Sequence, residues 1–165
     1  MGKGKRIATS GIGSALLGGW QMNGILTLRS GLPLSFYTSQ NLTGSLSGGS
    51  RPMKLRSAVL PESQRTIDRW FDTAAFIAPP QFQFGNAPRT EPDLRGPGTT
   101  QFDFSLFRNF RITEKVTVQA RGEAFNVLNR VNLGVPATTV GAAGLGTITS
   151  ADDARSIQVG LRFWF

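Results

Sequence analysis

The sequence contains no cysteine and no histidine, and both absences limit the chemistry that the chain can support. Without cysteine there is no disulfide framework and no thiolate nucleophile, and without histidine there is no imidazole base. Ordinary zinc sites are excluded as well, because they depend on these two side chains. We therefore expect no catalytic, cofactor-binding or metal-binding residues, and we expect that the protein is not an enzyme. The compartment stays open, because cysteine-free chains occur both among exported and among cytosolic proteins.

Charged residues are also scarce, at 17% of the 165 residues, against roughly 25% in a typical soluble domain. Glycine (20 residues) and phenylalanine (12 residues) are abundant instead, which indicates that part of the surface does not meet water. The net charge of +8 raises nucleic acid as a partner. The basic residues, mostly arginine, are scattered singly, without a basic helix, a zinc-finger spacing or a ribonucleoprotein motif. We therefore expect no nucleic-acid partner.

An uncharged stretch over residues 7–28 superficially resembles a signal peptide or a membrane helix. Half of it is polar or glycine, and each glycine costs a helix roughly 1 kcal/mol. From Trp20 onward the apolar residues recur every second position, which is typical of a strand with one apolar face. The even-numbered positions with apolar residues or glycine are Trp20, Met22, Gly24, Leu26, Leu28, Leu32, Leu34 and Phe36. We predict a long strand near residues 20–36 rather than a leader peptide.

Three further segments show the same alternation, and we predict strands near residues 101–112, 114–125 and 155–165. Two residues of the first segment depart from the pattern. Arg108 lies on its apolar side and Phe107 on its polar side. Either a β-bulge lies at this point or the Arg108 side chain extends toward a polar boundary.

The connections between these strands differ greatly in length. A tight turn near Thr113 joins two of them, whereas the connections 38–100 and 126–154 are long and rich in small and polar residues. Short turns that alternate with long loops, on strands of about ten residues, are typical of transmembrane β-barrels. The residues that we expect to face lipid are Trp20, Met22, Leu26, Leu28, Phe102, Phe104, Leu106, Phe110, Val116 and Val118.

These patterns predict an all-β protein, namely an antiparallel transmembrane β-barrel segment with long extracellular loops. It supplies four strands of a larger barrel, or five if residues 5–17 contain another. A soluble β-sandwich binding module is the alternative, because half-buried strands have the same period of two. The sandwich is disfavoured by the unequal connection lengths and by a chain that ends on a strand without a polar tail.

A series of motifs resembles the C-terminal end of TonB-dependent receptors, and most closely their Oar-like branch. It covers nearly the whole chain, from about Leu17 to Phe165, and the specificity comes from the order of several motifs. The motifs are GGWQMNGILTLRSGLPLS, RWFDTAAF, FGNAPR, LRGPGTTQFDFSLFRNF, RGEAFNVLNRVNLGVP, GLGTITSADDAR and RSIQVGLRFWF.

The resemblance implies an outer-membrane barrel of about 22 strands with an N-terminal plug in its lumen. Such receptors import a scarce ligand, which is a metal chelate, vitamin, sugar or peptide, with energy transmitted by TonB. The resemblance also implies a recognition signal for the barrel-assembly machinery on the last strand. Its residues are Ile157, Val159, Leu161, Phe163 and Phe165.

The sequence contains no plug, TonB box or signal peptide, and even the smallest closed barrels need about 8 strands. We therefore interpret residues 1–165 as the C-terminal part of a longer receptor in the cell outer membrane. Its expected partners are membrane lipid and lipopolysaccharide, the remainder of its own barrel and plug, and TonB only through the part that the sequence lacks. An outer-membrane adhesin or structural barrel is the alternative function.

The loop 38–100 contains the remaining candidate residues. An anionic ligand or lipopolysaccharide phosphate is one interpretation of its basic residues, and a solvated loop is the other. Trp70, in the motif RWFDTAAF, is either part of an aromatic sugar platform or part of a small core of the loop with Phe71 and Phe76. The candidate ligand contacts are Arg51, Lys54, Arg56, Arg65, Arg69 and Trp70.

Overall fold

The computed structural model of the protein describes residues 18–44 and 50–165, which consist of strands, turns and extended chain with two short 3-10 turns. These residues separate into two compact units. The first contains the described residues up to Leu28 together with Thr100–Val131 and Asp153–Phe165, and the second contains Arg29–Thr99 and Asn132–Asp152. Within the described ranges, no helix has the length and apolar character needed to cross a membrane.

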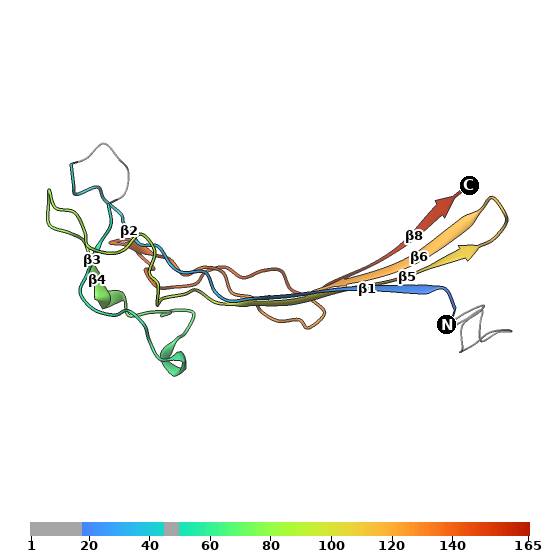
Figure 1. Ribbon diagram of the computed structural model, residues 1–165, viewed down its shortest axis with the longest axis horizontal. Helices are drawn as coiled ribbons and strands as arrows, with labels where there is room; N and C mark the ends of the chain where they lie inside the picture. The colour runs from blue at the N-terminus through green and yellow to red at the C-terminus, as the bar shows by residue number, and fades with distance from the viewer. Residues whose placement is uncertain (1–17, 45–49) are drawn as a thin grey trace. The chain divides into compact units, whose positions relative to one another are not determined.

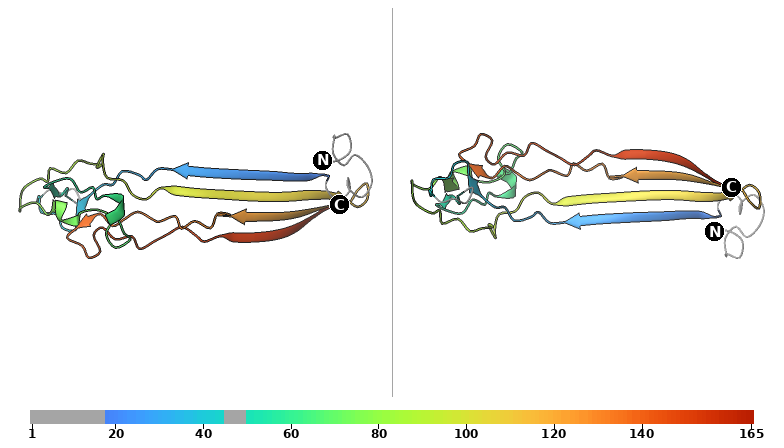
Figure 2. Two further views of the ribbon diagram at one scale, coloured as in Figure 1. Left: turned by 90° about the horizontal axis from the view of Figure 1, so that it is seen from below. Right: turned by 90° about the horizontal axis from the view of Figure 1, so that it is seen from above.

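The first unit is an antiparallel sheet of four strands that lie side by side (Figure 1, Figure 2). The strands are β1 (Trp20–Arg29), β5 (Thr99–Arg111), β6 (Thr117–Phe125) and β8 (Ser156–Trp164). Their order in the sheet is β1-β5-β6-β8, so β1 and β8 form its two edges. The antiparallel all-β sheet predicted from the alternating pattern is therefore present.

The register of this sheet separates apolar from polar side chains. Phe110 on β5 pairs with Val118 on β6, which pairs with Phe163 on β8, so these three side chains share one face. On β1, a Cβ atom added to Gly24 would lie 3.1 Å from the Phe102 ring, which puts the even residues of β1 on the same face. We call this the apolar face; its members are Trp20, Met22, Leu26, Leu28, Phe102, Phe104, Leu106, Phe110, Val118, Ile157, Val159, Leu161 and Phe163.

The structure corrects the predicted end of the first strand, which is Arg29 and not residue 36. Leu34 and Phe36 continue the alternation but are 2% and 1% exposed, because they belong to the core of the second unit. The chain stays extended beyond β1, and Leu34 N donates to Leu94 O at 3.0 Å. Extended, paired chain explains why the period of two runs past the end of the sheet.

The hairpin between β5 and β6 corrects a second boundary. The N–H groups of Ile112 and Thr113 both donate to Val116 O, at 2.9 and 3.2 Å, and Val116 N donates to Thr113 Oγ1 at 3.0 Å. These bonds close a turn, so β6 begins at Thr117 and not at residue 114. Val116, predicted to face lipid, lies in this turn and outside the strand.

The pairing of β5 with β6 also decides between the two explanations for Arg108. The Cα partners run without interruption from Phe104↔Ala124 to Arg111↔Thr117. A β-bulge would leave one residue unpaired. There is no bulge at Arg108, and its side chain lies on the apolar face.

The second unit shows that the long connections are folded and not merely irregular. It contains two small sheets, in which β2 (Tyr37–Thr38) pairs with β7 (Thr139–Val140) and β3 (Met53–Lys54) pairs with β4 (Phe76–Ile77). Two 3-10 turns, η1 (Glu62–Gln64) and η2 (Thr73–Ala75), lie between β3 and β4 in the chain. Its core consists of Leu34, Phe36, Ala58, Phe71, Ala75, Phe76, Ala87, Leu94 and Val140.

Three phenylalanines organise that core. The Phe36 ring stacks on the Phe76 ring with centroids 4.0 Å apart, and its contact with Phe71 is edge-to-face at 5.1 Å. Fully buried aromatic rings each remove a large apolar area from water. This core gives the loop segments a fixed structure of their own.

Candidate membrane interface and loop site

The apolar face is a candidate interaction surface of the first unit. Its aliphatic side chains are unusually open to solvent, with 86% exposure at Val159, 70% at Met22 and 67% at Leu161. A soluble β-sandwich would bury such a face against a second sheet. A continuous exposed apolar surface marks an interaction site or a membrane contact.

Aromatic residues lie at both ends of this face. Phe110 and Phe163 flank Val118 in one row near the hairpin turn, and Trp20 is the first residue of β1. Toward the other end, the Phe102 and Phe104 rings lie 6.4 Å apart. Strands of about ten residues, tilted by about 45°, span the roughly 25 Å apolar band of an outer-membrane barrel. Two aromatic girdles at its borders are the pattern of such barrels.

The opposite face of the same strands is polar and internally hydrogen-bonded. Gln119 Nε2 donates to Asn109 Oδ1 at 2.8 Å between β6 and β5, and Gln158 Nε2 donates to Glu123 Oε2 at 2.6 Å between β8 and β6. Glu123 Oε1 also lies 3.3 Å from Arg121 Nε. Cross-strand polar pairs of this kind stabilise a sheet and line a hydrated lumen.

Asp103 anchors the end of this polar face where β6 ends. Its Oδ1 accepts from Asn126 N at 2.9 Å, and Gln101 Nε2 donates to both carboxylate oxygens at 3.0 and 3.1 Å. Asn126 adopts a left-handed backbone with φ of 50°, which fits the tight exit from β6. Asp103 and Glu123 are not among the predicted site residues, although both lie at polar positions of the predicted strands.

A pocket of about 150 Å³ opens on the polar side of the sheet. It contains the side chains of Asp103 and Glu123, and both carboxylates already accept hydrogen bonds from neighbouring residues. Within the described residues, no group of three or more histidine, cysteine or acidic side chains is arranged to hold a metal ion. Apolar residues, among them Ile25 and Phe125, line the pocket together with these carboxylates.

The structure gives several candidate basic residues of the second unit partners within the protein. Arg56 and Arg69 both contact Asp72, with Arg56 Nη2 at 2.8 Å and Arg69 Nη2 at 3.7 Å from its carboxylate oxygens. Arg65 Nε donates to Leu60 O at 2.9 Å, and its guanidinium lies 5.9 Å from the Trp70 ring centroid. These contacts use several of the charges within the fold, and they do not gather them around one anion site.

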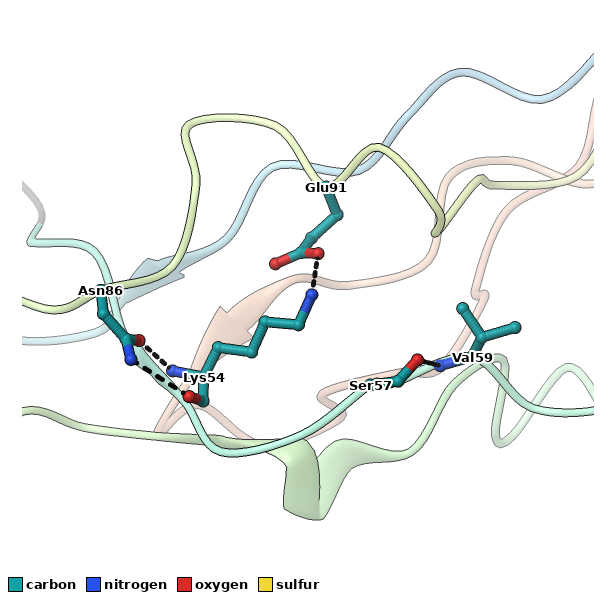
Figure 3. A network of polar contacts seen from close by, with 5 residues as sticks. All are labelled: Lys54, Ser57, Val59, Asn86 and Glu91. Atoms are coloured by element: carbon teal, nitrogen blue, oxygen red, sulfur yellow. Dashed lines mark hydrogen bonds and ion pairs between the residues drawn. The ribbon is translucent and has the colours of Figure 1, made fainter.

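Lys54 has a partner of the same kind, which Figure 3 shows from close by. Its ammonium contacts Glu91 Oε2 at 2.5 Å, and the Glu91 side chain is only 2% exposed. Asn86 accepts from Lys54 N at 2.6 Å and donates to Lys54 O at 3.2 Å. Lys54 thus joins β3 to two later segments of the second unit. Of the candidate basic residues, Arg51, Arg56 and Arg69 are exposed at the surface.

The aromatic residues of the motif RWFDTAAF separate into two roles. Phe71 and Phe76 are 0% and 3% exposed and form the core, so they do not present a platform to a sugar. Trp70 packs against that core and donates from Nε1 to Arg95 O at 2.7 Å. The interpretation of this motif as a small core of the loop is the one that the structure supports.

Comparison with protein families identifies the architecture. The family model described as an outer membrane beta barrel domain matches residues 1–158. The chain belongs to this family. No curated protein and no solved structure matches the chain. Membership explains the two-faced sheet, because an outer-membrane barrel turns its apolar face to lipid and its polar face to the lumen.

Four of the five proposed assembly residues are on β8. Ile157, Val159, Leu161 and Phe163 lie on the apolar face of β8 at the edge of the described sheet. Phe165 lies outside the strand and is fully exposed. Their role in assembly stays a prediction.

Proposed function

We propose that this outer-membrane barrel domain is the wall and loop part of a TonB-dependent receptor that imports a scarce ligand. The observation that carries the proposal is the folded second unit. A barrel that only anchors or seals needs no loop segments with their own aromatic core and a buried ion pair. A receptor needs loops of fixed structure above its lumen, because pre-organised surfaces bind with less loss of entropy.

The order of the motifs supports the same proposal. The segments from GGWQMNGILTLRSGLPLS to RSIQVGLRFWF resemble TonB-dependent receptors in sequence order. Metal chelates, vitamins, oligosaccharides and peptides are the ligand classes that this resemblance implies. The role is transport and not catalysis.

The open edges of the sheet define what else the barrel requires. β1 and β8 each have one neighbour in the described sheet, and lipid does not tolerate unpaired strand edges. We propose that further strands of the same receptor close the barrel, that its plug fills the lumen, and that the barrel-assembly machinery inserts it. Lipid and lipopolysaccharide surround it in the outer membrane.

A ligand-independent experiment tests the proposal. The protein, expressed from its complete gene with an affinity tag, is crosslinked in growing cells with formaldehyde and purified from the outer membrane. We expect a covalent adduct with TonB, which should disappear in a strain without TonB. Recovery of the folded barrel without any TonB adduct would contradict the receptor function and favour an adhesin or structural barrel.

Uptake assays then address the ligand class. Radiolabelled ferric citrate, cyanocobalamin and maltohexaose serve as probes in cells with and without the gene. We expect uptake of one of them to depend both on this gene and on TonB. A gene that changes attachment of cells to surfaces, but changes no energised uptake, identifies the adhesin instead.

A further inference from the structure

Arg108 is the one charged side chain among the positions that the described strands place on the apolar face. Its partner on β6 is Ala120, and the partner of Ala120 on β8 is Leu161. The acidic residues of β5 and β6, Asp103 and Glu123, lie on the polar face.

Two aromatic rings hold the guanidinium in place. Its Cζ lies 4.6 Å from the centroid of Phe110 and 5.6 Å from the centroid of Trp20. Both distances fall within the range of a cation–π interaction, which strengthens where water is excluded. The three residues come from β5 and β1, so the arrangement depends on the pairing of two strands that are distant in sequence.

The depth of this group in the sheet suggests its ligand. Phe110, Val118 and Phe163 form the aromatic girdle at the end with the hairpin turn. Arg108 lies on the same face, two residues along β5 from Phe110. A guanidinium is costly in the middle of a bilayer but costs little near the headgroups. At that depth the available anion is a lipid phosphate, and the planar fork of arginine suits phosphate oxygens.

We propose that Arg108, Trp20 and Phe110 form a binding site for the phosphate group of a glycerophospholipid. Short turns of such barrels lie in the periplasm, so the lipid belongs to the periplasmic leaflet. The guanidinium binds the phosphate, and the two rings hold its plane at the headgroup level. The site rests on the outer-membrane placement in the proposed function and not on transport, so a failed TonB test leaves it standing.

The chain supplies a matched control for this site. Arg162 on β8 pairs with Gln119, one row away from Arg108, and stacks over the Trp164 ring at 4.9 Å. Arg162 therefore has the same charge, a similar aromatic contact and nearly the same depth. It differs in facing the polar side of the sheet, away from lipid.

Native mass spectrometry of the full protein, purified from outer membranes in mild detergent, tests the site. We expect wild-type barrels to retain bound glycerophospholipid. Arg108→Gln should lower the retained fraction roughly tenfold, the loss expected for one strong charge-assisted contact, whereas Arg162→Gln should retain it. Equal retention in Arg108→Gln and wild type would overturn the site.

Two further variants cover the case in which Arg108→Gln does not fold. Arg108→Lys keeps the charge but loses the planar fork, and Trp20→Phe keeps a ring with weaker cation–π attraction. Both should fold, as judged by heat-modifiable mobility in gels, and both should retain less lipid than wild type. Wild-type retention in both folded variants also overturns the proposal.

Adding lipids back to delipidated protein distinguishes the source of the phosphate. Dioleoyl phosphatidylglycerol should rebind to wild type and not to Arg108→Gln, and dioleoylglycerol, which has no phosphate, should rebind to neither. Rebinding of dioleoylglycerol to wild type would show that acyl chains alone bind here. Arg108-dependent rebinding of lipid A in preference to phosphatidylglycerol would overturn the assignment to the periplasmic leaflet.

Discussion

Leu106 and Val118 both lie on the apolar face, but the register puts them at different depths. Leu106 pairs with Gly122 near the centre of β5 and β6, whereas Val118 lies in the aromatic girdle beside Phe110. The cost of a charge on the lipid face depends on depth. Substitutions at these two residues therefore test both the face and the depth.

We expect Leu106→Arg to lower the free energy of unfolding by about 2–4 kcal/mol, and Val118→Arg by about 0–1 kcal/mol. Ser105→Arg is the control, because Ser105 lies on the polar face opposite Glu123 and gains an opposite charge. The measurement is denaturant unfolding of the complete barrel in lipid vesicles. Equal losses for Leu106→Arg and Ser105→Arg would show that the faces are misassigned.

Lys54 and Glu91 form a buried ion pair whose two partners differ in exposure. The Lys54 side chain is 27% exposed and the Glu91 side chain 2%, and Glu91 Oε1 accepts no hydrogen bond. Loss of the lysine leaves a buried carboxylate without compensation. Loss of the carboxylate leaves a lysine whose long stem can turn its ammonium to water.

We expect Lys54→Met to destabilise the second unit by about 3–5 kcal/mol, as for a broken buried pair, and Glu91→Gln to cost clearly less. The double variant Lys54→Met with Glu91→Gln should recover part of the loss, because no buried charge remains. Limited trypsin digestion of the loops in intact barrels, over a range of temperatures, measures these differences. A larger effect from Glu91→Gln than from Lys54→Met contradicts the assignment.

At the scale of elements, two extended segments of the second unit, residues 31–34 and 94–96, lie side by side, and we call them the two arms. They contain an isolated bridge between Pro33 and Arg95, and Gly96 N donates to Leu32 O at 2.9 Å. A Cβ atom added to Gly31 would lie 1.7 Å from Gly96 O, so the two backbones approach too closely for any side chain. A Cβ atom added to Gly96 would meet its nearest neighbour at 3.6 Å, an ordinary contact.

We expect Gly31→Ala to separate the arms at a cost of about 1–3 kcal/mol or more, as in overpacked sites. Gly96→Ala in the facing arm should be neutral, or stabilising by up to about 1 kcal/mol through the unfolded state. Hydrogen exchange at the N–H of Leu34, which bonds to Leu94 across the arms, reports the separation. Equal exchange in the two variants would mean that the close approach at Gly31 does not hold.

At the scale of the whole molecule, chain order determines which connections share a side of the membrane. The connections after β1 and after β6 leave the same end of the antiparallel sheet, and the turn between β5 and β6 lies at the other. Long loops of outer-membrane barrels face the exterior and short turns the periplasm. Residues 1–165 contain no cysteine, so each introduced cysteine is the single thiol of this segment, and the protein without it gives the background labelling.

We expect Ala143→Cys, at an exposed position of the second unit, to react with an impermeant maleimide on whole cells. Lys115→Cys, exposed in the hairpin turn, should react only after the outer membrane is permeabilised. Labelling in gels of outer-membrane fractions measures both. The reversed pattern would invert the barrel and with it the leaflet of the proposed phosphate site.

The sequence by itself determined the two faces of the sheet. Side chains of any strand point alternately to its two faces. The period of two therefore assigns residues such as Val118, Leu161 and Phe163 to the apolar face, even when the strand pairing is unknown. It also indicated the tight hairpin and the unequal connections. Those features are local, and they were enough to predict a barrel segment.

The tertiary structure alone decided the properties that depend on distant pairing. The end of β1 at Arg29, the internal partners of the basic loop residues and the depth of Val118 all follow from which segments meet. Alternation continues wherever a chain is extended, whether it pairs in a sheet or enters a core, so Phe36 looked like a strand residue. In the sequence, Arg108 was only an exception to the alternating pattern. It became a candidate phosphate site because strand pairing brought Trp20 to its side.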